Sequence, residues 1–468
     1  MDFKVKQLFP NTRNFSIFSL FLYAKSITVI DESTFGTRKV LYHTFGCKLN
    51  FAETSTLARM LGERGYVRVQ RGETPDIVVV NTCSVTELAD KKCRQAIRGF
   101  GRRYPAARII VTGCYAQLKT DEVRGLPGVA IVAGSNQKLA LADYLDSIDD
   151  SAEPLALVEA AKDIREFVPS CSRGDRTRYF LKVQDGCDYF CSYCTIPFAR
   201  GRSRSGTIDS LVRQAGEAAA EGGREIVLTG VNVGDFGKGR PDTFFDLIRE
   251  LDKVEGIERF RISSIEPNLL TDEIIDWVAG SRAFMPHFHV PLQSGDDYVL
   301  RIMRRHYDTA LFRHRVERIR TAMPDAFIGV DLITGARGET PERFASSRAF
   351  VESLPVSRLH VFPYSERPGT RALDLDEYVV SPRDRHERAR TMIGISERKL
   401  DDFSKRFVGT VRPVLVEGRQ SGGMMHGFTD NYLKVCFKAD ASLTNRIVGV
   451  RLTSVDGEEM RGEVVTPL

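Results

Sequence analysis

Three cysteines stand close together near the middle of the chain, in the run Cys187-Asp-Tyr-Phe-Cys191-Ser-Tyr-Cys194. The run follows a stretch that is typical of a β-strand. Cysteine thiolates are the usual ligands of iron–sulfur clusters, and three of them on a 4Fe–4S cluster leave one iron open to another ligand. A zinc site is the alternative, but it needs a fourth ligand. The only nearby candidate, Cys171, gives a spacing that fits no common zinc pattern.

A second set of three cysteines is spread along the N-terminal part of the chain. Cys47, Cys83 and Cys114 each lie just past the end of a predicted strand, 36 and 31 positions apart. The carboxyl ends of parallel strands meet at one edge of a sheet, where ligands usually bind. We therefore expect these thiols to converge and to hold a second cluster, again with one open iron. The alternative is three unrelated buried cysteines, since free cysteine is among the most buried residue types.

The other three cysteines form no such pattern. Cys93 lies inside a predicted helix, Cys171 lies in a polar segment, and Cys436 alternates inward in a predicted strand. We expect structural roles for all three. Nine cysteines are also too few, and an odd number, for a disulfide scaffold in a chain of 468 residues.

The composition is that of a folded chain with several domains. At roughly 150 residues per domain, the length suggests about three domains. Hydrophobic residues make up 42% and charged residues 28%, which excludes a mostly disordered or fibrous chain. The net charge of +5 permits a nucleic-acid partner without requiring one.

No apolar stretch reaches the roughly 18 residues of a membrane helix, so we expect no membrane contact. The nearest is a run of about ten residues over 15–24, which follows Lys4, Lys6 and Arg13 and looks like a signal peptide with a poor cleavage site. We favour the alternative that 1–37 is disordered or a mis-assigned start. The folded chain then begins near Thr37, and we expect a cytoplasmic location.

Three patterns divide the rest of the chain. Over 38–150, strands alternate with helices, which predicts a parallel sheet. The strands are expected at 40–44, 76–80, 108–112 and 131–133, and the helices at 52–64, 87–103, 119–125 and 137–145. Residues 151–178 are polar and contain Pro154 and Pro169, which predicts a linker with one short strand near 155–158.

Over 179–403, a strand–helix unit repeats about six times, whereas eight units would close a full barrel. We therefore expect a partial barrel or an open doubly wound sheet. The strands are expected at 179–184, 225–229, 260–264, 287–291, 327–333 and 358–363, and the helices at 208–221, 244–251, 271–279, 309–323, 341–354 and 383–407. Over 404–468, strands at 411–416, 432–437 and 446–452 predict a small β-barrel of the kind that often binds RNA or DNA.

The two cysteine sets, in this order and followed by a small β-domain, resemble the methylthiotransferase family of radical S-adenosylmethionine (SAM) enzymes. The likeness runs from about Lys39 to the C-terminus. It implies an α/β fold with an N-terminal flavodoxin-like parallel sheet, a central radical SAM (βα)6 partial barrel and a C-terminal OB-like TRAM barrel. It also implies two 4Fe–4S clusters as cofactors, with SAM on the open iron of the cluster at Cys187, Cys191 and Cys194.

Local motifs separate three branches of this family. The branches act on isopentenyladenosine in tRNA, on threonylcarbamoyladenosine in tRNA, or on an aspartate of a ribosomal protein. The runs Thr44-Phe-Gly-Cys-Lys-Leu-Asn50, Asn81-Thr-Cys-Ser-Val-Thr-Glu-Leu-Ala-Asp-Lys-Lys92 and Gln184-Asp-Gly-Cys187 resemble the threonylcarbamoyladenosine branch. The isopentenyl branch usually has Tyr-Gly-Cys-Gln-Met-Asn and Glu-Gly-Cys there, and the ribosomal branch usually has Leu-Gly-Cys-Pro-Lys-Asn.

The resemblance also implies a SAM pocket. One candidate, Tyr193, stands just before the third cysteine of the motif. The others follow the ends of barrel strands: Gly230, Glu266, Gln293 and Gly335. The family usually has Gly-Phe-Pro-Gly-Glu at the last of these places, where this chain has Gly335-Ala-Arg-Gly-Glu339. The SAM contact of that loop is therefore in doubt.

The implied reaction adds a methylthio group to carbon 2 of the modified adenosine at position 37 of tRNA, beside the anticodon. It needs no acid–base residue, because replacing an aromatic C–H is work for a radical cofactor. The implied partners are a tRNA anticodon stem-loop and an electron donor such as flavodoxin or ferredoxin. The alternatives are the other two branches, or a non-catalytic metal-containing RNA-binding protein.

Basic residues form three groups that could contact RNA phosphates. The third group is the best placed because it directly follows the cysteine motif. The groups are Lys91, Lys92, Arg94, Arg98, Arg102 and Arg103; Arg301, Arg304, Arg305, Arg313, Arg315, Arg318 and Arg320; and Arg200, Arg202 and Arg204. The alternative for each is a solvated surface.

Overall fold

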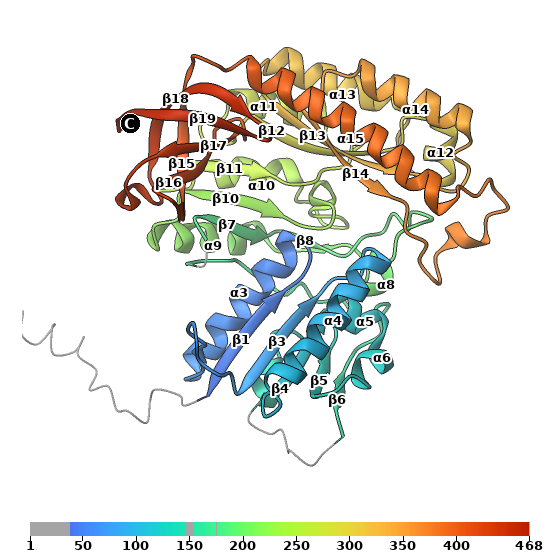
Figure 1. The fold of residues 1–468 in the computed structure, drawn as a ribbon, viewed down its shortest axis with the longest axis vertical. Coiled ribbons are helices and arrows are strands. Elements are labelled where there is room, and N and C mark those ends of the chain that lie inside the picture. The colour runs from blue at the N-terminus through green and yellow to red at the C-terminus, as the bar shows by residue number, and fades with distance from the viewer. Residues whose placement is uncertain (1–37, 146–152, 175, 468) are drawn as a thin grey trace, which may run out of the picture.

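The computed structural model describes residues 38–145, 153–174 and 176–467 (Figure 1). The prediction for 1–37 lies outside these ranges. The described chain forms a parallel sheet with helices, a second strand–helix layer and a C-terminal barrel, in the order that the sequence predicts.

The N-terminal sheet has six parallel strands in the order β2-β1-β3-β4-β5-β6. Its strands are β1 (Lys39–Thr44), β2 (Val67–Arg68), β3 (Ile77–Thr82), β4 (Arg108–Gly113), β5 (Val129–Ala133) and β6 (Leu155–Leu157). The long central strands form because nearly all their residues are apolar and buried. The short strand expected near 155–158 is β6, which extends this sheet beside β5.

Helices cover both faces of the N-terminal sheet. They are α3 (Lys48–Glu63), α4 (Glu87–Arg103), α5 (Cys114–Leu118), α6 (Thr120–Arg124) and α7 (Leu141–Tyr144). The predicted bounds of α4 are confirmed, and its start is fixed by the Thr86 hydroxyl, which accepts from the Ala89 amide. The helix expected over 137–145 is only one turn long, since α7 begins at Leu141.

The central domain is a partial barrel of six parallel strands. They are β7 (Arg178–Lys182), β10 (Glu225–Thr229), β11 (Arg259–Ile262), β12 (His287–Gln293), β13 (Phe327–Thr334) and β14 (Arg358–Pro363). They form two three-stranded sheets, which isolated parallel bridges Phe260–Phe284 and Ser264–His289 join between β11 and β12. The predicted partial barrel is thereby confirmed, and the open doubly wound sheet is not.

The helices on the outside of the partial barrel cover the apolar face of its strands (Figure 1). The outer layer consists of α9 (Ile208–Ala220), α10 (Phe244–Asp252), α11 (Asp272–Gly280), α12 (Asp297–Ile302), α13 (Thr309–Ala322), α14 (Pro341–Ser353) and α15 (Pro382–Lys405). All seven begin at a Ser, Thr or Asp whose side chain accepts from the first helical turn. The sequence did not predict α12 because it is short.

Alternation along the barrel strands puts polar side chains on the inner face. Phe288, Val290 and Leu292 of β12 pack in the outer core, so His287 and His289 face the lumen. The same alternation turns the following side chains inward: Arg178, Phe180, Lys182, Glu225, Val227, Arg261, Asp331 and His360. A polar lumen of this kind suits a polar substrate.

The C-terminal domain is a closed barrel of five strands in the order β15-β16-β17-β19-β18. They are β15 (Val411–Ser421), β16 (Met424–Thr429), β17 (Lys434–Lys438), β18 (Ile447–Asp456) and β19 (Glu459–Pro467). The predicted barrel is confirmed, but the sequence did not predict β16 and β19. Both strands lack a continuous apolar run. In the described ranges, no helix is both long and apolar enough to cross a membrane.

Candidate active site

The three clustered cysteines lie on a loop between two short elements of the central domain. Cys187 follows β8 (Gln184–Asp185), and Cys194 precedes α8 (Ile196–Arg200). The Tyr189 amide points at the Cys187 sulfur and the Ile196 amide at the Cys194 sulfur, each at 3.5 Å. Backbone N–H groups aimed at sulfur are the usual surroundings of an iron–sulfur ligand.

Burial is the main reason that the pKa values of Cys187 and Cys194 rise to about 12, and the charges of neighbouring thiols raise them further. Thiols that are this shielded from water are costly to ionise alone. Bound iron compensates their charge, so the donor set fits a metal cluster.

Arg305 is a functional candidate that sequence reasoning placed wrongly on the surface. Its side chain is only 3% exposed. It donates to the Cys191 sulfur at 3.0 Å and to the Tyr193 hydroxyl at 3.5 Å, and it pairs with Glu266. One guanidinium thus joins a proposed cluster ligand to two of the expected SAM-binding residues. A guanidinium is suited to this because its donors form a rigid planar fork.

Gln184 joins the cysteine loop to the loop that follows β10. Its side-chain oxygen accepts from the Val231 and Asn232 amides, both at 2.9 Å. Its side-chain nitrogen donates to the Gly186 carbonyl at 2.7 Å. Gly230 lies against this amide, since a Cβ there would be 2.9 Å from the Gln184 oxygen. The Gln184 motif therefore positions both Cys187 and the expected SAM loop.

The last two expected SAM residues lie at the ends of β12 and β13. Gln293 follows a register shift at the end of β12 and has a φ of 65°, which is strained for a non-glycine residue. Gly335 has a φ of 76°, and its amide donates to the Glu339 carboxylate at 2.8 Å. Arg388 fixes that carboxylate with a bond of 2.6 Å. The loop at 335–339, which differs from the family motif, is thus held by hydrogen bonds to the protein's own side chains.

Three buried polar atoms on neighbouring loops have no hydrogen-bond partner within the described part of the chain. They belong to two side chains, the Ser263 hydroxyl and the Asn232 amide, whose oxygen and nitrogen are both unpartnered. Buried polar groups in proteins are almost always bonded. Since both lie in motifs expected to line the SAM pocket, they fit a polar ligand such as SAM.

The second cysteine set converges at one edge of the N-terminal sheet, as predicted from strand order. Cys83 follows β3, while Cys47 and Cys114 stand at the start of α3 and α5. Burial raises the pKa of Cys83 to about 12, and the charges of Cys114 and Cys47 raise it further, so the three thiols are neighbours. One thiol, Cys47, is exposed.

Glycines before two of these cysteines make the approach possible. Gly46 and Gly113 have φ values of 101° and 100°. A Cβ at Gly46 would lie 2.9 Å from the Cys83 Cβ, and one at Gly113 would lie 2.4 Å from the Thr82 carbonyl oxygen. Only glycine tolerates both the left-handed backbone and this proximity.

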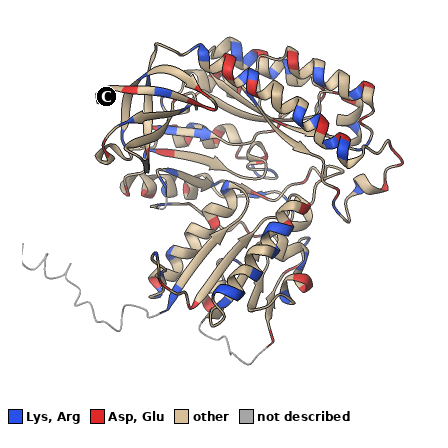
Figure 2. Ribbon diagram, in the orientation of Figure 1, with Lys and Arg blue, Asp and Glu red and all other residues tan. Residues whose placement is uncertain are grey.

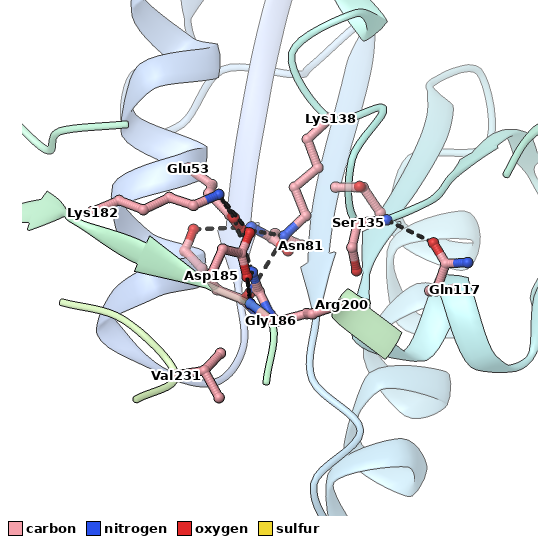
Figure 3. Close-up of polar contacts among 12 residues, drawn as sticks. Glu53, Asn81, Gln117, Ser135, Lys138, Lys182, Asp185, Gly186, Arg200 and Val231 are labelled. Atoms are coloured by element: carbon pink, nitrogen blue, oxygen red, sulfur yellow. Dashed lines mark hydrogen bonds and ion pairs between the residues drawn. The ribbon is translucent and has the colours of Figure 1, made fainter. Parts of the chain in front are cut away.

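A buried network of charges joins α3 to β7, β8 and α8 (Figure 3). Glu53 of α3 accepts from Arg200 and Lys182, both at 3.0 Å, and pairs with Lys138. Asp185 accepts from Arg200 at 2.9 Å. All five side chains are at most 3% exposed. Burial would raise the pKa of Glu53, but the three cations together hold it well below its usual range.

Three family models match consecutive parts of the chain. Residues 39–134 match the uncharacterized protein family UPF0004, residues 181–351 the radical SAM superfamily, and residues 405–465 the TRAM domain. The chain is 37% identical over 436 residues to the threonylcarbamoyladenosine tRNA methylthiotransferase MtaB of Bacillus subtilis, covering 91% of this chain and 96% of the relative. The chain belongs to the radical SAM methylthiotransferase family, in its MtaB-type branch.

Further relatives of this methylthiotransferase carry two different names. The MtaB protein of Thermotoga maritima is 35% identical, covering 85% of this chain and 91% of its own. The tRNA-2-methylthio-N(6)-dimethylallyladenosine synthase of Aliarcobacter butzleri is 31% identical, covering 92% and 99%. Among solved structures, the radical SAM methyltransferase TsrM of Kitasatospora setae has a TM-score of 0.51 at 16% identity, covering 83% of this chain and 80% of its own. That likeness shows the fold alone.

Several arginines of the methylthiotransferase that the sequence predicts to contact RNA are buried or form ion pairs within the fold. Arg200 and Arg305 are buried, and Arg204 pairs with Asp185 at 3.1 Å, so these predictions are wrong. Arg315 and Arg318 pair with acidic residues of α11. Lys and Arg alternate with Asp and Glu across these outer helices (Figure 2), which leaves little excess positive charge there.

The basic residues of α4 remain accessible. In the first group, Arg94 is half-buried and pairs with Glu122 at 3.1 Å. The others are exposed, namely Lys91, Lys92, Arg98, Arg102 and Arg103. This face of α4 therefore remains a candidate for RNA contact.

The three remaining cysteines are buried, as expected. The prediction that Cys436 points into the barrel is wrong, because its neighbours Val435 and Phe437 fill the core and the alternation turns Cys436 outward.

Cys436 lies with His426 and Glu459 on the outside of the TRAM barrel, with ligand atoms within 4.8 Å of one another. Arg461 already donates to the Cys436 sulfur at 3.2 Å, and Lys434 pairs with Glu459 at 2.5 Å. Two cations among the three groups oppose binding of a metal ion there.

The TRAM barrel places a tyrosine at the N-terminal end of the partial barrel. The Tyr432 hydroxyl accepts from Arg178 at 3.2 Å, and its ring lies 4.1 Å from that of His287. Arg261 stacks over the same ring at 4.9 Å and donates to the Thr429 and Asp430 carbonyls. Tyr432 thus covers part of the lumen at the end opposite the cysteine loop.

Proposed function

We propose that this methylthiotransferase adds a methylthio group to carbon 2 of threonylcarbamoyladenosine at position 37 of tRNA, beside the anticodon. The support comes from the MtaB relatives, whose names give this nucleoside, and from the Lys48 and Gln184 motifs. A nucleoside in a single-stranded loop can be turned out of its stack and read by a pocket.

We assign one 4Fe–4S cluster to Cys187, Cys191 and Cys194 and another to Cys47, Cys83 and Cys114. When bound, these clusters supply the reductive cleavage of SAM and the sulfur for insertion, respectively. SAM serves twice, as methyl donor and as radical source. A flavodoxin- or ferredoxin-type protein is the proposed electron donor.

The observation that carries this proposal is the contact between the two cysteine sets. Thr195 directly follows Cys194, and Ser84 directly follows Cys83. The Thr195 hydroxyl donates to the Ser84 carbonyl at 3.5 Å. A radical site and a sulfur site must act on one substrate atom, so they must lie side by side.

The chain's own residues supply position and shielding. Arg305 orients Glu266 toward Cys191, and Gln184 fixes the loop at 230–232 beside Cys187. On the other side, α3 covers the inner face of the barrel, where Phe51 meets Phe180 at 5.8 Å. These contacts exclude water from the space where a radical would react.

For tRNA binding, we assign the anticodon stem-loop to the mouth of the partial barrel and a more distant part of the tRNA to the TRAM domain. The TRAM match over 405–465 supports this assignment. The exposed basic face of α4 begins with Lys91 and Lys92, eight and nine positions after Cys83, and continues along the helix to Arg103. Contacts with phosphates there would make binding dependent on salt.

Mass spectrometry of tRNA nucleosides from cells with and without this gene tests the proposed function. Loss of methylthio-threonylcarbamoyladenosine, with accumulation of its unthiolated precursor, is the expected result. Loss of methylthio-isopentenyladenosine instead would keep the chemistry and overturn the substrate. If neither nucleoside changes, the ribosomal-protein aspartate becomes the substrate to test, and after it the non-catalytic interpretation.

A further inference from the structure

Most of the charged side chains that face the barrel lumen have a partner of opposite charge. Glu225 pairs with Arg261 at 2.8 Å, and Asp331 with His289 at 2.8 Å. Arg178 pairs with Glu417 at 3.1 Å. Each of these three carboxylates therefore already has a partner.

An exception is Lys48, the first residue of α3. Helical spacing puts Lys48 on the same side of α3 as Phe51 and Ala52. These two residues pack against Phe180 and Val227 on the inner face of the barrel. Lys48 therefore also faces the lumen, one helical turn closer to Cys47 than Phe51 and Ala52 are.

The electrostatics of the lumen agree with this placement of the Lys48 charge. Burial is the main cause of the low pKa values of His287 and His360, the latter about 4, and the Lys48 charge lowers both further. Both histidines line the floor of the lumen, in a cavity that also borders His289 and Tyr432. Because His360 is neutral near pH 7, it offers hydrogen bonds and no charge.

Lys48 has no carboxylate partner among the residues that the structure describes, although its side chain is only partly exposed. Its charge is therefore available to an anion in the lumen. His289 and Asp331 are each 22% exposed on the opposite wall, so a ligand can reach them.

The geometry points to Lys48 as the residue that binds the carboxylate of the substrate's threonylcarbamoyl group and so selects this nucleoside. The inference rests on the proposed function. A threonylcarbamoyl group carries a carboxylate, a hydroxyl and amide-like groups, whereas a dimethylallyl group is a hydrocarbon. The His289–Asp331 pair and His360 offer partners to the hydroxyl and amide-like groups.

Selection follows from the cost of leaving the ammonium unpaired. A site that is built to pair a polar group rejects an analogue without it far more strongly than an apolar pocket rejects an extra group. A dimethylallyl group in this lumen would shield Lys48 from water and provide no counter-charge. Lys48 thus acts in substrate binding and not in the radical chemistry.

The test uses the reconstituted holoenzyme and anticodon stem-loop RNAs that differ at one group. One RNA carries N6-threonylcarbamoyladenosine, and the other carries the same group with its carboxylate converted to a carboxamide. Methylthiolation gives kcat and KM for each RNA, and fluorescence anisotropy gives Kd. We expect the wild type to prefer the carboxylate by about 100-fold in kcat/KM.

Lys48→Gln should reduce that preference to within about threefold, mainly through KM and Kd, because the cation is lost while the volume is nearly kept. Lys48→Arg should keep part of it. Lys253→Gln, on the outer helix layer, is the matched control and should behave as the wild type. Iron content is measured for every variant, so that a loss of preference is read only from enzyme that carries its clusters.

A wild type that does not distinguish the two RNAs overturns the inference, whether or not Lys48→Gln folds. So does a Lys48→Gln enzyme that keeps the full preference. In both cases the proposed function stands if the threonylcarbamoyl RNA is methylthiolated. A wild type that modifies only a dimethylallyl RNA overturns the proposed function together with this inference.

Discussion

Glu53 and Arg200 form a buried ion pair between the N-terminal domain and the radical SAM domain, with Glu53 Oε1 3.0 Å from Arg200 Nη1. The two residues are 147 positions apart in the chain. Glu53 lies on the helix that Cys47 starts, and Arg200 ends the helix that follows Cys194. The pair therefore fixes the two cysteine sets relative to each other.

Replacing Glu53 by Gln should destabilise the contact between the domains. Removal of one partner from a buried pair leaves uncompensated charge and typically costs about 3–5 kcal/mol. We expect Glu53→Gln to have a lower urea midpoint at pH 7 than Glu250→Gln, which changes an exposed ion pair on α10. Equal urea midpoints for the two variants would contradict the assigned role.

The Glu53 effect should also depend on pH. The pKa of Glu53 is lowered in the folded protein, so its contribution to stability is present above the unfolded value, near 4.5. It is lost as the pH falls toward the folded value. The difference in stability between the wild type and Glu53→Gln should therefore be full at pH 6–7 and shrink below about pH 4.5. A difference that grows on acidification would reverse the sign of this argument.

Cys83→Ala should separate the two halves of the reaction. We expect on the order of eight irons per wild-type chain and about four in this variant. SAM cleavage should continue while methylthiolation stops. Cys171→Ala, a buried cysteine outside both sets, should keep all the iron. Four irons in the wild type would remove the second cluster, and zero would remove the whole scheme.

Arg305→Met should impair SAM cleavage without unfolding the enzyme. The variant removes the hydrogen bond to the Cys191 sulfur and the partner of Glu266. Since hydrogen bonds to sulfur raise the potential of an iron–sulfur cluster, we expect a lower midpoint potential and about 10–100-fold slower 5′-deoxyadenosine formation. Arg305→Lys should restore part of the rate. An unchanged potential by EPR titration would show that Arg305 only fills space.

Reversing charge on α4 should weaken tRNA binding in a salt-dependent way. Each lost phosphate contact lowers the slope of log K against log salt by about 0.9 for a duplex and 0.7 for a single strand. Arg98→Glu with Arg102→Glu should therefore reduce the slope by up to about two units. Arg213→Glu, exposed on α9, is the control. An unchanged slope would assign the α4 face to solvent.

Much of the fold follows from the sequence because buried strands are long apolar runs. The runs at 77–82 and 108–113 read directly as strands, and the cysteines after them converge as parallel topology requires. Strand β16 was missed because Gly427 and alternating polar residues interrupt its pattern. Such strands are stabilised by barrel closure, which is a non-local property.

The polar part of the site was harder to predict. Arg305 stands in a run of arginines, and sequence alone does not show which one turns inward to Cys191. The partners of Glu53 come from α8, β7 and a loop after β5, so no local spacing indicates them. Lys48 belongs to the motif at 44–50, but its position at the lumen depends on how α3 packs against the barrel, which the sequence does not show.

The contact of Tyr432 with Arg178 and His287 has a consequence for the path of small molecules. This ring lies across the end of the lumen that is opposite the cysteine loop. Deleting the TRAM domain should therefore do more than weaken the proposed binding of RNA. It would also open this end of the lumen, so that water and dioxygen could enter the proposed reaction space.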